Sequence, residues 1–251
     1  MKLFMIITLL TSYYAQAETV ILGPATNIGL GQASSFAKLN DSQTIDSIGM
    51  VFSGKVLEGL PAGHRHDYEY TLTLPPDISL PPFNHFTINW NPHGHAPTEI
   101  YGVPHFDFHF YFISEHQRHS IKCDGTDNAI CMKQPRDEYK PRFYVPGPEG
   151  VPMMGWHWVD LRSPELNGKP FTASYIYGFY NGEIIFLEPM IALSYLQTKP
   201  QVTAQIPLPS NAAVPGKYPA SYSLIYDSVR DLFWLSLEQL TEIKNVQTVN
   251  Q

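Results

Sequence analysis

The chain has 251 residues, a formal net charge of −7, 22 prolines, 10 histidines and two cysteines. A negative chain with no basic cluster is not suited to bind a phosphate backbone, so nucleic acid is excluded as a partner. The length allows one large β domain or two small ones, and either can bury a core.

The first 17 residues, MKLFMIITLLTSYYAQA, have the features of a secretory signal peptide. Lys2 supplies the basic start, Leu3 to Leu10 form the apolar run, and Ala15-Gln16-Ala17 is a small-x-small cleavage site. The apolar run is shorter than the roughly 20 residues that cross a bilayer. We therefore expect an exported chain, periplasmic or extracellular, that starts at Glu18 and contains no transmembrane segment. An N-terminal membrane anchor is the alternative.

Short strands separated by proline and glycine dominate the rest of the chain. Strands are predicted at 68–74, 86–90, 105–112, 171–180, 183–193, 221–227 and 232–240. Asn181-Gly182 favours a type I′ hairpin. The final strand also fits a helical period. We expect a mainly β fold, either an antiparallel sandwich or a barrel-like sheet, with long Pro-rich loops and little helix.

The composition divides the chain into five segments. They are a signal peptide (1–17), a polar N-terminal segment (18–49), a β-rich histidine-containing core (50–197), a Pro-rich connector (198–219) and a C-terminal hairpin or short helix packed on the core (220–251). The first polar segment could be partly helical between Gln32 and Leu39. Within the core, residues 113–170 form a long Pro-rich excursion, and loops of this length are usually functional or fastened down.

Cys123 and Cys131 enclose a polar loop inside that excursion. In an exported protein we expect them to form a disulfide that staples the loop. A pair of thiolate metal ligands is the alternative, although the gap of seven residues is longer than that of an ordinary zinc knuckle.

The histidines are confined to residues 64–157, and four of them fall between 93 and 109. In the predicted strand 105–112, side chains alternate between the two faces, so the phenylalanines point into the core. The opposite face carries His105, Asp107, His109 and Tyr111. A His-x-Asp-x-His face can supply two or three ligands to a divalent transition metal, zinc being the first choice. His105 and His109 are the central candidates, with Asp107 and Tyr111 as supporting residues that orient an imidazole.

Four further residues are candidate ligands. They are His93 and His95 in the HGH step, His157 in GWHW, and Glu188 in IIFLEPMIAL. Gly94 permits a tight turn that could bring both neighbouring rings to one centre. A carboxylate in an apolar strand is costly to bury unless it is paired, protonated or bound to metal. Glu188 could therefore also pair with Arg162 or with a buried histidine.

The segments PPFNHFTINWNPHGHAPTEIYGVPHFDFHFYF, MGWHW and YGFYNGEIIFLEPM resemble a family of exported bacterial proteins classed as a domain of unknown function. The shared pattern is an HGH step, PHFDFHFY, a downstream G-x-H and a strand ending in FLEPM, and it covers about residues 50 to 195. The resemblance implies family membership and a β-rich fold, but no activity. Its pattern contains His93, His95, His105, Asp107, His109, His157 and Glu188.

Two functions remain open from the residues alone. One is an exported metal-binding β protein, which could be a metal-dependent hydrolase or an oxygen-handling enzyme. The other is a non-catalytic binding or structural protein whose His/Asp/Glu cluster is a hydrogen-bond network. The signatures H-E-x-x-H, G-x-S-x-G and Walker A do not occur. A homo-oligomer, a small-molecule ligand, the metal and the substrate are left open.

Overall fold

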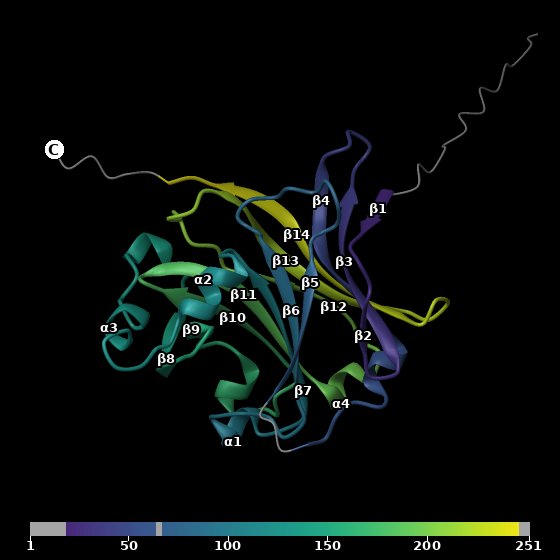
Figure 1. Ribbon diagram of the computed structural model, residues 1–251, viewed down its shortest axis with the longest axis horizontal. Helices are drawn as coiled ribbons and strands as arrows, with labels where there is room; N and C mark the ends of the chain where they lie inside the picture. Colours follow the sequence, from purple (N-terminus) through teal and green to yellow (C-terminus); the bar gives the residue numbers. More distant parts are fainter. Residues whose placement is uncertain (1–18, 64–66, 246–251) are drawn as a thin grey trace, which may run out of the picture.

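The computed structural model describes residues 19–63 and 67–245. The predicted signal peptide, His64 and His66 lie outside these ranges. The described chain forms two antiparallel sheets of seven strands each, packed face to face as an open sandwich (Figure 1). The prediction of a mainly β, sandwich-like fold is confirmed.

Sheet A joins strands from both ends of the chain, in the order β1-β3-β4-β14-β13-β12 with β2 paired to β3. Its strands are β1 (Thr19–Leu22), β2 (Thr26–Ile28), β3 (Gly31–Leu39), β4 (Ile45–Ser53), β12 (Gln201–Gln205), β13 (Gly216–Asp227) and β14 (Leu232–Ile243). The central contact between β4 and β14 ties the N-terminal segment to the C-terminal hairpin.

Sheet B contains the histidine-rich part of the chain, in the order β5-β6-β7-β11-β10-β9-β8. Its strands are β5 (Tyr68–Thr73), β6 (His85–Asn91), β7 (His105–Tyr111), β8 (Tyr144–Val151), β9 (Gly155–Asp160), β10 (Ala173–Tyr180) and β11 (Glu183–Ala192). β7 is an interior strand, paired on one side with β6 and on the other with β11.

The helices are all short. They are α1 (Thr98–Tyr101), α2 (Glu115–Ser120), α3 (Asn128–Cys131) and α4 (Leu193–Leu196), with the 3-10 turns η1 (Gly54–Leu57), η2 (Asp137–Tyr139) and η3 (Pro164–Asn167). Figure 1 shows α2 and α3 on the side of sheet B that is turned away from sheet A. In residues 19–63 and 67–245, no helix is long and apolar enough to cross a membrane.

Local sequence signals correctly predicted five strands of sheet B, namely β5, β6, β7, β10 and β11. The Asn181-Gly182 turn joins β10 to β11, with φ of 53° at Asn181 and 79° at Gly182, as a type I′ turn requires. Predicted strands 68–74, 86–90 and 105–112 agree with β5, β6 and β7 to within the usual uncertainty of strand ends.

The expectation of helix between Gln32 and Leu39 is wrong, because these residues lie in β3. For the C-terminal segment, hairpin and helix were alternatives, and the structure has the hairpin of β13 and β14. Both strands pair on two sides, β3 with β1, β2 and β4, and β14 with β4 and β13. Helical propensity is a weak preference, and pairing between distant segments overrides it.

The core lies between the sheets and is built largely from aromatic rings. Phe108 of β7 stacks on Phe52 of β4 across the sandwich, with ring centroids 5.5 Å apart. Tyr175 of β10 likewise stacks on Tyr222 of β13 at 5.3 Å. Phe106 and Phe110 are fully buried in the same cluster. The phenylalanine face of β7 is therefore core, as the alternation predicted.

The predicted disulfide is present. Cys123 and Cys131 are bonded, with their Cα atoms 5.3 Å apart. The bridge packs on β8 at Gly150, so it fastens the start of the long excursion to the edge strand of sheet B. Asp127 inside the loop accepts hydrogen bonds from the backbone N–H groups of Lys122 and Cys123.

Replacing Phe108 by alanine is expected to lower the free energy of unfolding by about 3–5 kcal/mol, because it removes a buried ring from the contact between the two sheets. Urea unfolding followed by circular dichroism measures this. As a control, Val229→Ala changes a side chain that is 91% exposed in a turn, and its effect should stay within about 0.5 kcal/mol. Equal effects of the two variants would contradict the packing described here.

Candidate metal centre

The polar row of β7 lies on the outer face of sheet B, yet it is buried. His105, Asp107 and His109 have almost no solvent exposure. Apolar residues from the covering loops and turns, such as Tyr101, Phe171 and Ile121, pack over this face in two small clusters. Charged and polar groups are therefore held in a buried layer outside the main core.

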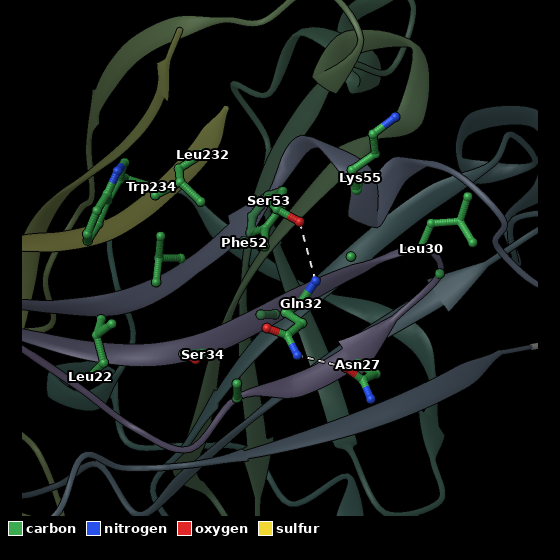
Figure 2. Close-up of a pocket in the computed structure, with 15 residues that line it drawn as sticks. Leu22, Asn27, Leu30, Gln32, Ser34, Phe52, Ser53, Lys55, Leu232 and Trp234 are labelled. Carbon is green, nitrogen blue, oxygen red and sulfur yellow. Dashed lines mark hydrogen bonds between the residues drawn. The ribbon is translucent and has the colours of Figure 1, made fainter. Parts of the chain in front are cut away.

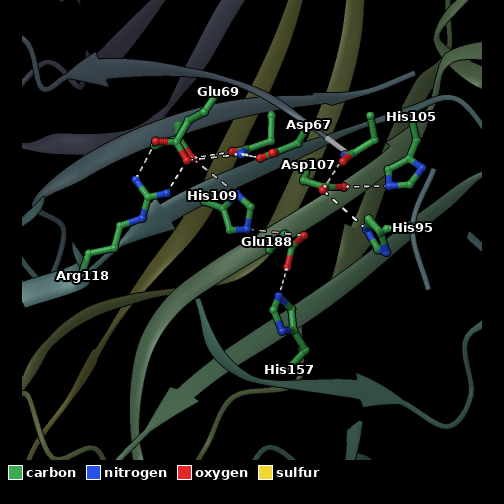
Figure 3. A network of polar contacts seen from close by, with 12 residues as sticks. Asp67, Glu69, His95, His105, Asp107, His109, Arg118, His157 and Glu188 are labelled. Carbon is green, nitrogen blue, oxygen red and sulfur yellow. Dashed lines mark hydrogen bonds and ion pairs between the residues drawn. The ribbon is translucent and has the colours of Figure 1, made fainter. Parts of the chain in front are cut away.

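Three of the candidate residues form a group that we call the Asp107 triad: His95, His105 and Asp107. His105 Nε2 lies 3.2 Å from Asp107 Oδ1, and His95 Nε2 lies 3.6 Å from Asp107 Oδ2 (Figure 3). Asp107, which was predicted to orient an imidazole, lies between two imidazoles in a group that could hold an ion.

Three others form the Glu188 triad: His109, His157 and Glu188. His109 Nε2 lies 3.6 Å from Glu188 Oε1, and His157 Nε2 lies 3.5 Å from Glu188 Oε2. These side chains come from β7, β9 and β11, so three strands of one sheet position them. Arg162 pairs with Asp160 instead of with Glu188.

A glycine in β10 allows the Glu188 triad to assemble. Gly178 lies in register between His157 of β9 and Phe186 of β11. A Cβ at Gly178 would lie 2.0 Å from the Phe186 ring, so only glycine lets this ring cross β10. The ring contacts His109 at 5.0 Å and His157 at 5.3 Å between centroids, and thereby supports both imidazoles.

The HGH step positions only one of its two histidines. Gly94 has φ of 68°, and a Cβ there would lie 2.1 Å from the Tyr101 carbonyl oxygen, so the predicted tight turn is present. The turn sends the two rings to different partners. His95 reaches Asp107, whereas His93 Nε2 lies 3.3 Å from the Gly63 carbonyl oxygen, outside both triads.

Tyr111 supports His109 through its ring. The His109 and Tyr111 rings are nearly parallel, with centroids 5.3 Å apart. His85, the residue of β6 that is paired with Tyr111, also stacks on the Tyr111 ring, with centroids 4.9 Å apart. The Arg118 guanidinium lies 4.6 Å from the Tyr111 ring centroid and pairs with Glu69. The sequence reasoning missed Arg118. Its only signal was an arginine in the first helix after the histidine strand.

Hydrogen bonds to Nδ1 fix the orientation of three imidazoles. His105 Nδ1 donates to the Val103 carbonyl at 2.7 Å, and His95 Nδ1 donates to the Ala96 carbonyl at 2.9 Å. His109 Nδ1 lies 3.4 Å from the Thr87 hydroxyl. That hydroxyl donates to Asn89 Oδ1 and so accepts from His109.

Burial lowers the pKa of His109 to about 3, so this ring is neutral near pH 7, and with the proton on Nδ1 its Nε2 lone pair faces Glu188. At His95, burial acts to lower the pKa, but the contacts with Asp107 and with the Ala96 carbonyl outweigh it and raise the pKa. Metal-binding histidines are usually held in this way, with Nδ1–H tethered to a carbonyl or another acceptor.

Several of the facing atoms lack a hydrogen bond. His105 Nε2, Asp107 Oδ1, His109 Nε2 and Glu188 Oε2 are buried and have no hydrogen-bond partner among the described residues. An unsatisfied buried polar atom costs about 1–3 kcal/mol. Ligands on one tetrahedral ion, each at about 2.1 Å, lie about 3.4 Å from one another. The nitrogen–oxygen distances of 3.2 to 3.6 Å in the two triads match that spacing.

Burial governs the charges of the site. It raises the pKa of the Glu188 carboxyl well above its ordinary value, and the charge of Asp107 adds to this. Burial lowers the pKa of His109 to about 3 and that of His157 to about 4. At Asp107, burial acts to raise the pKa, but His105 and His95 outweigh it and hold the pKa below the usual range. The imidazoles of the Glu188 triad are therefore neutral near pH 7, with lone pairs available to a cation.

Comparison of the chain with protein-family models, with curated proteins and with solved structures gave no match. The geometry of the two triads therefore carries the functional argument.

A separate hollow of about 870 Å³ lies on sheet A, around the turn between β2 and β3 (Figure 2). Leu22, Leu30, Lys55 and Trp234 line it, and Gln32 donates a hydrogen bond to Asn27 at its wall. It contains no histidine or carboxylate. The predicted chemistry is therefore confined to sheet B.

The metal-free protein is expected to lose stability as the pH falls from about 6.5 to about 4. Burial lowers the pKa of His85 and His157 to about 4 and that of His109 to about 3, while the same groups titrate near 6.5 in the unfolded chain. The unfolded chain then binds more protons, so the free energy of unfolding falls with pH. Glu188 and His95, whose pKa values are raised, act in the opposite direction, but the three histidines with lowered pKa values outweigh them.

Urea midpoints at pH 7.5, 6 and 5, measured with a chelator present, test this expectation. The control is a double variant, His116→Gln with His119→Gln, which changes two exposed histidines of α2 and should keep the same pH dependence. A midpoint that is constant or rises between pH 7.5 and 5 would contradict the burial of neutral histidines.

Proposed function

We propose that this is an exported protein that binds a divalent transition metal, zinc being the first choice, on the outer face of sheet B. The observation that carries the proposal is the set of buried imidazole nitrogens and carboxylate oxygens that lack a hydrogen bond among the described residues and face one another at ligand spacing. Metal coordination would satisfy these atoms.

The donor set favours a transition metal over calcium or magnesium. Each triad offers two imidazole nitrogens and one carboxylate. Calcium and magnesium prefer all-oxygen sites, whereas imidazole suits zinc, iron, copper and nickel. Two histidines with one carboxylate also occur in catalytic zinc sites and in non-haem iron sites. Zinc is the first choice because it is bound by three or four such ligands without redox chemistry.

Export is supported by two features. The disulfide between Cys123 and Cys131 is of the kind that persists in an oxidising compartment. The N-terminal sequence has the basic start, apolar run and small-x-small site of a signal peptide. We extend the proposal to membership of the exported bacterial family whose HGH, PHFDFHFY and FLEPM pattern this chain resembles.

A metal-dependent enzyme is the form of this function that the ligand count favours. Three protein ligands leave at least one coordination position for water or substrate, and water on such an ion is a nucleophile near neutral pH. The side chains of His95 and His157 are 35% and 20% exposed, so solvent reaches one end of each triad.

The competing function is a non-catalytic protein in which the cluster only fastens the sheet. The near-complete burial of His105 and His109 favours it, because a catalytic centre needs access. The unpartnered atoms oppose it, because a structural network would satisfy them.

Elemental analysis tests metal binding directly. The mature chain, exported and purified without a histidine tag, is expected to retain zinc or another transition metal, because the donors are held in place by the sheet. A double variant, His105→Ala with His109→Ala, removes one ligand from each triad and is expected to retain none. Absence of metal from the unchanged protein, with no rise in melting temperature on adding zinc, manganese, copper or iron, would refute the proposal.

Glu188→Gln separates the two functions. Burial disfavours the charged carboxylate, so a neutral amide of the same shape is expected to keep or raise the stability of the metal-free protein at pH 7.5. The same change removes a ligand oxygen and is expected to weaken zinc binding at least tenfold, since removing even a supporting residue costs 10–100-fold. Urea unfolding with a chelator and zinc titration measure both effects. A metal-free variant that is less stable than the unchanged chain would favour the hydrogen-bond network.

A further inference from the structure

The geometry points to two ion sites on this face, the Asp107 triad and the Glu188 triad, each with its own divalent transition-metal ion. This inference rests on the proposed function and goes beyond it, because metal binding alone would be met by one ion shared among the six residues. The two arrangements predict different stoichiometry, and the structure favours the pair.

The pairing of the side chains on β7 separates the two groups. His105, Asp107 and His109 are successive outward residues, with Cα atoms about 6.6–6.8 Å apart. Asp107 pairs with His105, whereas His109 pairs with Glu188 of β11. Two donors on one ion are at most about 4.4 Å apart, because each lies about 2.0–2.2 Å from it. The donor atoms within each triad all lie within 4.8 Å of one another, which a small contraction onto an ion would accommodate.

The carboxylate oxygens are already divided between the histidines of their own triads. Asp107 turns Oδ1 to His105 and Oδ2 to His95, and Oδ2 also accepts a hydrogen bond from the Asn91 side-chain amide at 2.7 Å. Glu188 turns Oε1 to His109 and Oε2 to His157. Each carboxylate therefore lies between two imidazoles of one group, as Figure 3 shows, and neither is arranged as the shared ligand of a single central ion.

The two sites differ in how firmly their ligands are held. All three ligands of the Glu188 triad are on strands of sheet B, and the Phe186 ring braces both imidazoles. The Asp107 triad takes His95 from the loop between β6 and α1, and this side chain is 35% exposed. Ligands on rigid strands are better preorganised than ligands on loops. The Glu188 triad therefore holds the tighter ion, and the Asp107 triad holds an exchangeable one.

Charge repulsion adds to this difference. Each divalent ion is only partly neutralised by its single carboxylate, and the two centres are about one pleat repeat apart. Occupation of one site therefore weakens the other. Sequential binding is expected, with dissociation constants that differ by at least about tenfold.

The experiment counts zinc on the full mature chain. Protein stripped with a chelator is reloaded with excess zinc, freed of unbound metal and analysed by mass spectrometry of the elements. The unchanged chain is expected to hold two zinc ions, and His95→Ala and His157→Ala one each. The matched control is His93→Ala, two residues from His95 and outside both triads, which is expected to hold two.

Competition titration with a coloured chelator assigns the sites. The unchanged chain should show two steps, His95→Ala should lose the weaker step, and His157→Ala the tighter one. With manganese or copper, dipolar broadening of the electron paramagnetic resonance spectrum should appear in the unchanged chain and disappear in either single variant. His95→Gln and His157→Gln, which preserve more side-chain volume, replace any alanine variant that fails to fold by circular dichroism.

One zinc ion on the unchanged chain, or none on either single variant, would overturn the paired sites and leave the proposed function standing. If His95→Ala lost the tighter binding step instead of the weaker one, the assignment of the exchangeable ion to the Asp107 triad would be overturned. An unchanged chain that binds no zinc would overturn the proposed function as well.

Discussion

The pleat of a single strand, β7, is the constraint on which the rest of the structure depends. Because side chains alternate along a strand, its phenylalanines enter the sandwich core while His105, Asp107 and His109 face outward. Phe108 joins the two sheets by stacking on Phe52. The same backbone thus fixes the packing of the sheets and the spacing of the candidate ligands. A one-residue shift in the pairing of β7 would turn the phenylalanines outward and the polar side chains into the core, and both the sheet packing and the polar cluster would be lost.

Burying the polar row is costly, and the surrounding residues limit the cost only in part. Arg118, itself buried, pairs with Glu69 and lies over the Tyr111 ring. Thr87 and carbonyl groups of the loops accept hydrogen bonds from imidazole Nδ1 atoms. Four atoms of the two triads are left without a hydrogen bond among the described residues: His105 Nε2, Asp107 Oδ1, His109 Nε2 and Glu188 Oε2. Proteins tolerate local conflicts of this kind mainly at functional sites.

Much of the site was predictable because its signals are local. Period-two alternation identified β5 and β7, and flanking prolines bounded the short strand that is β6. The Asn181-Gly182 pair identified the β10–β11 hairpin, and an isolated glutamate in an apolar strand identified Glu188. The errors arose where distant segments meet. β3 had helical features but pairs on both sides, and Asp107 lies between two imidazoles because the His95 loop folds over it. His93 was as good a candidate as His95 from the sequence, but the turn at Gly94 directs its ring to the Gly63 carbonyl oxygen.

The sequence by itself determined which residue types share a face, since the two-residue period of a strand and the chemistry of imidazole and carboxylate need no tertiary information. It therefore determined the β class, the core row of β7, the disulfide pair and most of the candidate ligands. Only the tertiary structure decided how those candidate residues are grouped. The order β7-β11-β10-β9 brings His109, Glu188 and His157 together from three strands, with Gly178 leaving room for Phe186 between them. Strand order depends on packing between residues far apart in the chain, and no local pattern contains it.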